Sequence, residues 1–122
     1  MPSVLVIEGA TILRHLFRCV LEPEGYEVRE AADGEAGVEA YRQAPADVVL
    51  CDVFLPRLGG LGVIQELLRL DPAVKVVALS GGGLWPAGDD LENARRLGAV
   101  AALAKPFGID ALLAALRRTL GP

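Results

Sequence analysis

Short apolar runs alternate five times along the chain with segments whose apolar residues recur every three or four positions. The run at 4–7 is continuously apolar, which is typical of a strand buried on both faces of a sheet, and the runs at 47–52, 74–79 and 100–104 are rich in Val, Leu and Ala. The run at 26–31 instead alternates apolar and polar residues, which indicates an edge strand. The pattern therefore predicts five strands, each followed by a helical segment.

The helical segments are expected at 11–21, 35–43, 61–70, 89–98 and 110–120. The first has an apolar face made of Leu13, Leu16, Phe17 and Val20. Asp89 and Glu92 have the spacing of a capping box and predict the start of the fourth helix. Strands that alternate with helices form a parallel sheet covered on both faces. Five such units favour an α/β fold, the flavodoxin-like doubly wound (βα)5 sandwich with strand order 2-1-3-4-5.

Length and composition set limits on the function. The 122 residues suit one domain spanning 1–122, and no output domain is visible. The net charge is −4 and the basic residues are scattered, so nucleic acid and anionic membranes are not expected partners. Cys19 and Cys51 form no disulfide framework, and Cys51, within an apolar strand, is expected to be a buried free thiol. With no signal peptide or membrane span predicted, we expect a cytoplasmic protein.

Polar residues close four of the five predicted strands: Glu8, Asp52, Ser80 and Lys105. In an open parallel sheet, ligands bind outside the carboxyl ends of the strands, near the point where the strand order reverses. A carboxylate there can act as a nucleophile toward phosphorus. An ammonium and a hydroxyl can bind the phosphoryl oxygens, and a second carboxylate helps to hold Mg²⁺. The set therefore indicates phosphoryl transfer to a carboxylate.

The same stretches give the chain a resemblance to a known family. It resembles the receiver domains of two-component response regulators over essentially its whole length. The matching stretches are Leu5–Glu8, Val48–Asp52, Leu55–Pro56, Gly60, Leu79–Ser80, Gly98–Ala99 and Lys105–Phe107. The Lys-Pro-Phe triplet, together with an Asp that closes the third strand four residues before Pro56, makes the resemblance specific.

The resemblance implies a role for each matching position. Asp52 would be the phosphoacceptor, and Lys105 and Ser80 would bind the phosphoryl group. Glu8, Asp52 and the backbone carbonyl of Phe54 would be the Mg²⁺ ligands. Pro106 would follow a cis peptide bond, as is frequent in the family.

Three positions depart from the family pattern. Gly9 stands where the second acidic residue of the metal site is expected, so Mg²⁺ binding would be weakened. Ala102 stands where an aromatic side chain usually follows the movement of the Ser80 hydroxyl at the output face. Phe54, two residues after the phosphoacceptor, is large where the family commonly has a small or polar residue, and would narrow access to Asp52.

These features favour a receiver that accepts a phosphoryl group on Asp52 from a histidine kinase or a phosphotransfer protein. We expect no enzyme activity beyond phosphorylation and dephosphorylation of Asp52 itself. A downstream protein would bind the face formed by 89–98, 100–104 and 110–120, and the chain would be a monomer or a weak homodimer. The alternative is a pseudo-receiver that binds partners without phosphorylation. A flavin carrier or stand-alone enzyme on the same fold is the third interpretation, and Glu8 disfavours it because a flavin phosphate would lie there.

Overall fold

The computed structural model describes residues 1–53, 55, 59–80, 87–104 and 108–121, with the backbone alone for 87–91. One parallel sheet has the order β2-β1-β3-β4-β5. Its strands are β1 (Ser3–Ile7), β2 (Glu27–Ala31), β3 (Val48–Asp52), β4 (Val76–Ser80) and β5 (Ala101–Ala104). The helices are α1 (Thr11–Leu21), the short 3-10 helix η1 (Glu22–Glu24), α2 (Gly34–Gln43), α3 (Gly60–Leu70), α4 (Ala87–Leu97) and α5 (Ile109–Leu120). The predicted α/β fold and strand order are confirmed.

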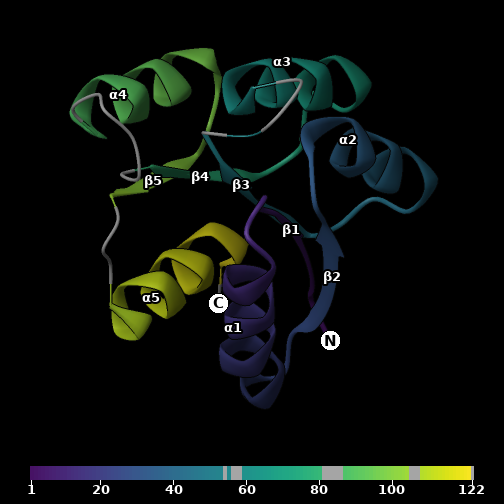
Figure 1. Ribbon diagram of the computed structural model, residues 1–122, viewed down its shortest axis with the longest axis vertical. Coiled ribbons are helices and arrows are strands. Elements are labelled where there is room, and N and C mark those ends of the chain that lie inside the picture. Colours follow the sequence, from purple (N-terminus) through teal and green to yellow (C-terminus); the bar gives the residue numbers. More distant parts are fainter. Residues whose placement is uncertain (54, 56–58, 81–86, 105–107, 122) are drawn as a thin grey trace.

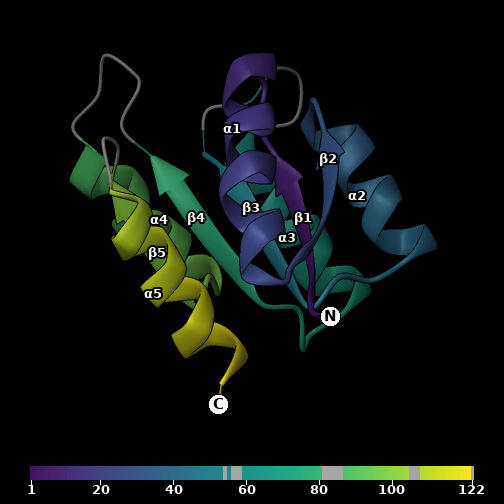
Figure 2. The ribbon, with the colours of Figure 1, turned by 90° about the horizontal axis from the view of Figure 1, so that it is seen from below.

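The helices cover both faces of the sheet. Helices α1 and α5 lie on one face, and α2, α3 and α4 lie on the other (Figures 1 and 2). Side chains along each strand alternate between the two layers: Val4 and Val6 pack with α1 and α5, whereas Leu5 and Ile7 pack with α2 and α3. Both faces of the central strands are therefore buried, which explains why these strands have continuous apolar sequences.

Two local predictions are wrong. Leu16 was expected to face the core, but 52% of its surface is exposed, whereas Phe17 is buried. One residue turns a helix by about 100°, and α1 packs on the sheet along a narrow stripe that leaves Leu16 outside. Helix α4 begins at Ala87, so Asp89 lies within its first turn and does not occupy the N-cap.

Among the described residues, no helix combines the length and apolar character needed to cross a membrane.

A buried tyrosine connects α2 to the segment after α3. The Tyr41 hydroxyl donates a hydrogen bond of 2.6 Å to Oδ2 of Asp71. Burial, this hydrogen bond and the negative charge of Asp71 raise the pKa of Tyr41 above its usual value of 10.0. The folded chain therefore keeps the Tyr41 proton at a pH where the unfolded chain loses it.

The raised pKa of Tyr41 predicts a loss of stability at alkaline pH. The protonated Tyr41 contributes fully to the free energy of unfolding below about pH 10. Above this pH, the contribution falls by up to about 1.4 kcal/mol per pH unit, until Tyr41 also ionises in the folded chain. Tyr41→Phe should show a shallower decline, because the variant lacks the titrating group. Urea unfolding of both proteins from neutral pH to pH 11 measures the difference, and parallel curves would contradict it.

Candidate functional site

Three buried polar side chains lie at the carboxyl ends of adjacent central strands. Glu8 directly follows β1, Asp52 ends β3 and Ser80 ends β4. Their exposed fractions are 3%, 5% and 0%, and they are the polar or charged residues that are buried in the described part of the chain. The register pairs Ile7 with Cys51 and Asp52 with Leu79, so the three residues lie at nearly the same level of the sheet.

This location is also the point where the strand order reverses. The chain leaves β1 toward β2 on one side and returns to β3 on the other side of β1. Crossovers that diverge in this way leave a crevice outside the carboxyl ends of the two strands, which is where doubly wound proteins bind ligands. The structure therefore brings Glu8, Asp52 and Ser80 together in the region that the fold makes suitable for a ligand.

Cys51 adds no reactive thiol to this group. Its side chain is buried and unpaired with another cysteine. Burial, followed by the charges of Asp52 and Glu8, raises the pKa of the Cys51 thiol far above its usual value. A thiol that stays protonated is neither a good nucleophile nor a metal ligand. The chemistry of the site therefore depends on its carboxylates and on Ser80.

Among the described residues, nothing accepts a hydrogen bond from the Ser80 hydroxyl. Its Oγ is buried and forms no hydrogen bond, as donor or as acceptor, with any described residue. A buried hydroxyl without a partner costs free energy, and most such groups in native structures bind a protein group, an ordered water or a ligand. An oxygen-rich group bound next to Asp52 would satisfy it.

The carboxylates of Glu8 and Asp52 are the kind of ligand that Mg²⁺ prefers. Gly9 offers no side chain to such an ion. In the described ranges, no group of three or more His, Cys, Asp or Glu residues is arranged to hold a metal ion. The residues thus fit Mg²⁺ in chemical type, with two anionic ligands in place of the three that the family pattern implies.

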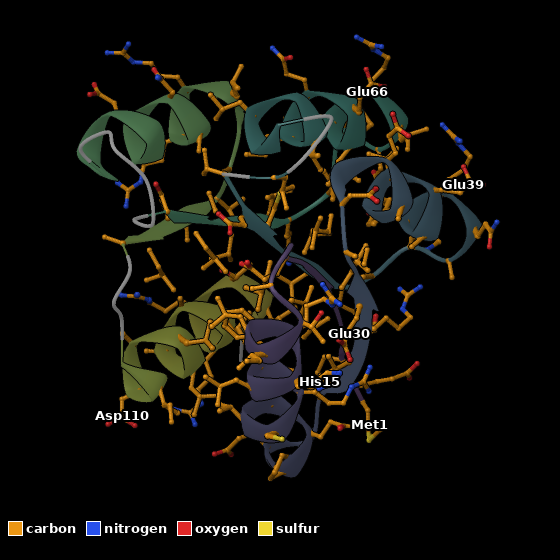
Figure 3. The ribbon with its side chains drawn as sticks, viewed as in Figure 1. Met1, His15, Glu30, Glu39, Glu66 and Asp110 are labelled. Atoms are coloured by element: carbon orange, nitrogen blue, oxygen red, sulfur yellow. The ribbon has the colours of Figure 1, made fainter. Side chains whose placement is uncertain are left out.

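An arginine that the sequence did not single out shapes the turn after β1. The Arg14 guanidinium donates hydrogen bonds to the backbone oxygens of Glu8 and Gly9, at 2.7 and 3.3 Å. It also forms an ion pair of 3.3 Å with Glu30, whose other oxygen binds Arg18 at 2.7 Å. The hydrogen bond from Arg18 is the main reason that the pKa of Glu30 is lowered. Glu30 and His15, whose charge also acts on Glu30, are both seen beside α1 (Figure 3).

A glycine holds the start of α3 against the end of β3. The Gly60 N–H donates to the backbone oxygen of Val53 at 2.9 Å. A β-carbon at Gly60 would lie 2.3 Å from the backbone oxygen of Asp52 and 2.4 Å from the α-carbon of Val53. Backbone atoms cannot come so close, so glycine is required here for α3 to pack beside Asp52. Gly60 belongs to the family pattern in the sequence, but the sequence alone did not indicate this role.

Some predicted site residues lie outside the described residues. These are Phe54, Lys105 and Pro106. Ala102 is in β5, where it is half-buried and packs against the core beneath α2, α3 and α4. The roles predicted for all of these positions stay predictions.

Comparison with known proteins defines the class. A family model described as the response regulator receiver domain matches residues 4–117. The chain therefore belongs to the response regulator receiver domain family. It is 29% identical over 116 residues to the chemotaxis protein CheY of Thermotoga maritima, a match that covers 94% of both chains.

Solved structures agree with this assignment. The receiver domain of a sensor histidine kinase from Pseudomonas aeruginosa, which holds a magnesium ion in its active-site cleft, is 28% identical with a TM-score of 0.87, and the match covers 99% of this chain and 98% of that one. NtrX from Brucella abortus is 30% identical with a TM-score of 0.89. The match covers 98% of this chain but only 27% of NtrX, so it concerns one part of that protein.

Proposed function

We propose that this receiver accepts a phosphoryl group on Asp52 from a histidine kinase or a phosphotransfer protein. The observation that carries the proposal is the buried Ser80 hydroxyl, which lacks a partner in the described structure and ends the strand beside Asp52. A phosphoryl group on Asp52 would supply the missing acceptor. Family membership supports the same chemistry.

In the proposed reaction, an oxygen of the Asp52 carboxylate attacks phosphorus. The bond from phosphorus to the donor atom breaks, its electron pair stays with the donor, and an acyl phosphate forms on Asp52. Ser80 donates a hydrogen bond to one phosphoryl oxygen, and Lys105 pairs with another, as the family resemblance implies. Mg²⁺, when bound through Glu8, Asp52 and the Phe54 carbonyl, would neutralise charge on the phosphoryl oxygens.

Phosphorylation should then be transmitted to partner proteins. We propose that a downstream protein binds the face made by α4, β5 and α5, and that the chain works in the cytoplasm as a monomer or weak homodimer. The phosphodonor would bind at α1, where Ile12 and Leu16 are 84% and 52% exposed. These apolar side chains follow each other at a spacing of one helical turn beside the site.

The second candidate is a pseudo-receiver that binds its partners without phosphorylation. Gly9 favours it, because Gly9 removes an anionic ligand from the position that would complete the metal site. The fold and the partner surfaces would be the same in both cases. The two functions differ in whether Asp52 gains a phosphoryl group.

Incubation with acetyl phosphate and Mg²⁺, followed by intact-mass analysis, tests the proposal. We expect one added phosphoryl group in the wild type and none in Asp52→Asn, which keeps the size of the side chain but removes the nucleophile. Ser80→Ala should be phosphorylated about tenfold more slowly, since one hydrogen bond to the transferring group is lost. Absence of the added mass, both with acetyl phosphate and with phosphorylated kinases of the source organism, would support the pseudo-receiver.

A further inference from the structure

A groove of about 590 Å³ runs between the last turns of α4 and α5, over the start of β5. Ala101 is part of its floor, and Ala115 of α5 contributes to one wall. Ala101 pairs with Val77 near the beginning of β4, whereas Ser80 ends that strand. The groove therefore lies at the opposite end of the strands from Asp52 and is separate from the phosphoryl site.

The floor of the groove is an open sheet edge. Strand β5 is the last in the order, and among the described strands it pairs only with β4. An edge strand leaves alternate N–H and C=O groups unpaired, and these can bind an added strand. Three of the side chains that line the groove are small, namely Ala99, Ala101 and Ala115, and Val100 is the larger apolar side chain among them. An extended peptide can therefore approach the backbone of β5 closely.

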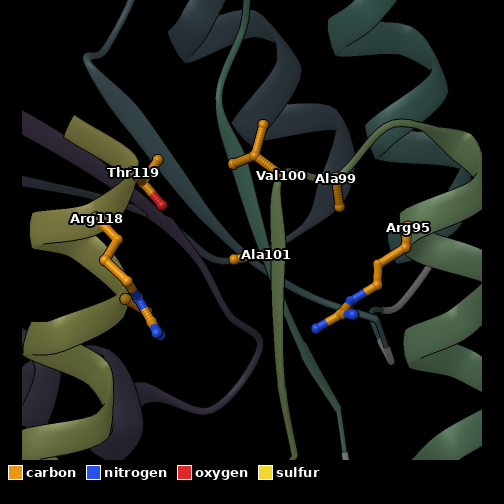
Figure 4. Close-up of a pocket in the computed structure, with 7 residues that line it drawn as sticks. Arg95, Ala99, Val100, Ala101, Arg118 and Thr119 are labelled. Atoms are coloured by element: carbon orange, nitrogen blue, oxygen red, sulfur yellow. The ribbon is translucent and has the colours of Figure 1, made fainter. Parts of the chain in front are cut away.

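The two walls of the groove carry positive charge. Arg95 projects from α4 and Arg118 projects from α5, on either side of β5 (Figure 4). Within the described part of the chain, neither guanidinium has a salt bridge, whereas the adjacent Arg96 pairs with Glu92 at 2.8 Å. None of the described residues that line the groove is acidic. The chain as a whole has a net charge of −4, so the groove is a local positive site on an acidic protein.

We infer that this groove binds an extended acidic segment of a partner protein. The segment adds as a strand to the free edge of β5, its carboxylates pair with Arg95 and Arg118, and a small apolar side chain rests between Ala101 and Ala115. A second copy of this chain is a poorer occupant, because pairing β5 with β5 would bring the arginines of the two copies together. The inference rests on the proposed partner role of this face and is independent of phosphorylation of Asp52.

The test uses two short peptides and the intact, unphosphorylated chain. The acidic probe is acetyl-Glu-Val-Glu-Val-Glu-amide, and the basic probe is acetyl-Lys-Val-Lys-Val-Lys-amide. In ¹H–¹⁵N NMR spectra we expect saturable shifts of the 101–104 amide signals with the acidic probe and none with the basic probe. Salt should weaken the binding, because the contacts are between exposed charges.

Matched variants identify the contacts. Arg95→Gln combined with Arg118→Gln should raise the Kd of the acidic probe by about three- to thirtyfold, since two exposed ion pairs are lost. Arg96→Gln combined with Arg117→Gln removes the same charge from the neighbouring helix positions outside the groove and should leave the Kd within about twofold. Equal losses in the two double variants, or no shift at 101–104, would overturn the inference.

Two further results distinguish peptide binding from phosphorylation of Asp52 and from dimer formation. Asp52→Asn should bind the acidic probe as the wild type does, so a failure of phosphorylation would leave the inference standing. Normal phosphorylation without peptide binding would overturn the inference alone. Sedimentation of the free chain should show a monomer at the concentrations used, and a dimer with protected 101–104 amides would overturn the choice of occupant.

Discussion

Gly60→Ala should destabilise the chain by about 2–4 kcal/mol and slow the phosphorylation of Asp52. The new methyl group would meet the backbone oxygen of Asp52 at 2.3 Å, so either β3 or the first turn of α3 must move. Movement of either one breaks the hydrogen bond of 2.9 Å from the Gly60 N–H to Val53. The displacement occurs at the residue proposed to attack phosphorus, where an error of about 1 Å lowers the rate strongly.

The adjacent glycine is the matched control. A β-carbon at Gly59 would have no atom within 4 Å, so Gly59→Ala tests the same change at the N-cap of α3 without the clash. It should cost about 1 kcal/mol, which is the usual loss when alanine replaces a better N-cap residue. Urea unfolding measures both losses, and intact-mass time courses with acetyl phosphate measure the rates. Equal stabilities of the two variants would show that α3 can move without cost.

Much of the fold could be predicted from the sequence because each element has a strong local pattern. The continuous apolar run at β3 predicted a central strand, and all five residues of Val48–Asp52 are buried. The predicted bounds of α1, Thr11–Leu21, agree with the structure because its apolar periodicity ends at Pro23 and Gly25. Predictions failed where tertiary packing determines whether a side chain is buried. Leu16 is an example, because its exposure depends on the orientation of α1 against the sheet.

The candidate site was predictable only in part. Strand ends are visible in the sequence, so Glu8, Asp52 and Ser80 could be placed at one edge before their burial was known. Contacts between distant segments leave no such pattern. Two features depend on distances that only the folded chain defines. They are the hydrogen bond from Arg14 to the backbone after β1 and the groove between α4 and α5.

Gly9→Asp should raise the affinity for Mg²⁺ by at least about tenfold. Two unit charges at 4 Å attract by about 4 kcal/mol near a protein surface, and the attraction to a divalent ion is larger. Loss of water from the ion and from the carboxylate offsets part of this gain. Gly9 is exposed and directly follows the buried Glu8, so the added side chain has room to reach an ion beside Glu8 and Asp52. Isothermal titration with Mg²⁺ measures the change without requiring phosphorylation.

Stability without the metal provides a second measurement of the same effect. In EDTA the introduced carboxylate adds a third negative charge near Glu8 and Asp52, so the variant should unfold at a lower temperature than the wild type. Mg²⁺ should reverse this order, because tighter binding to the folded state adds more stability. Gly9→Asn supplies an oxygen of similar reach without the charge and should bind Mg²⁺ more weakly than Gly9→Asp. Equal affinities of wild type and Gly9→Asp would mean that position 9 does not limit metal binding, and Phe54 would then be the departure to test.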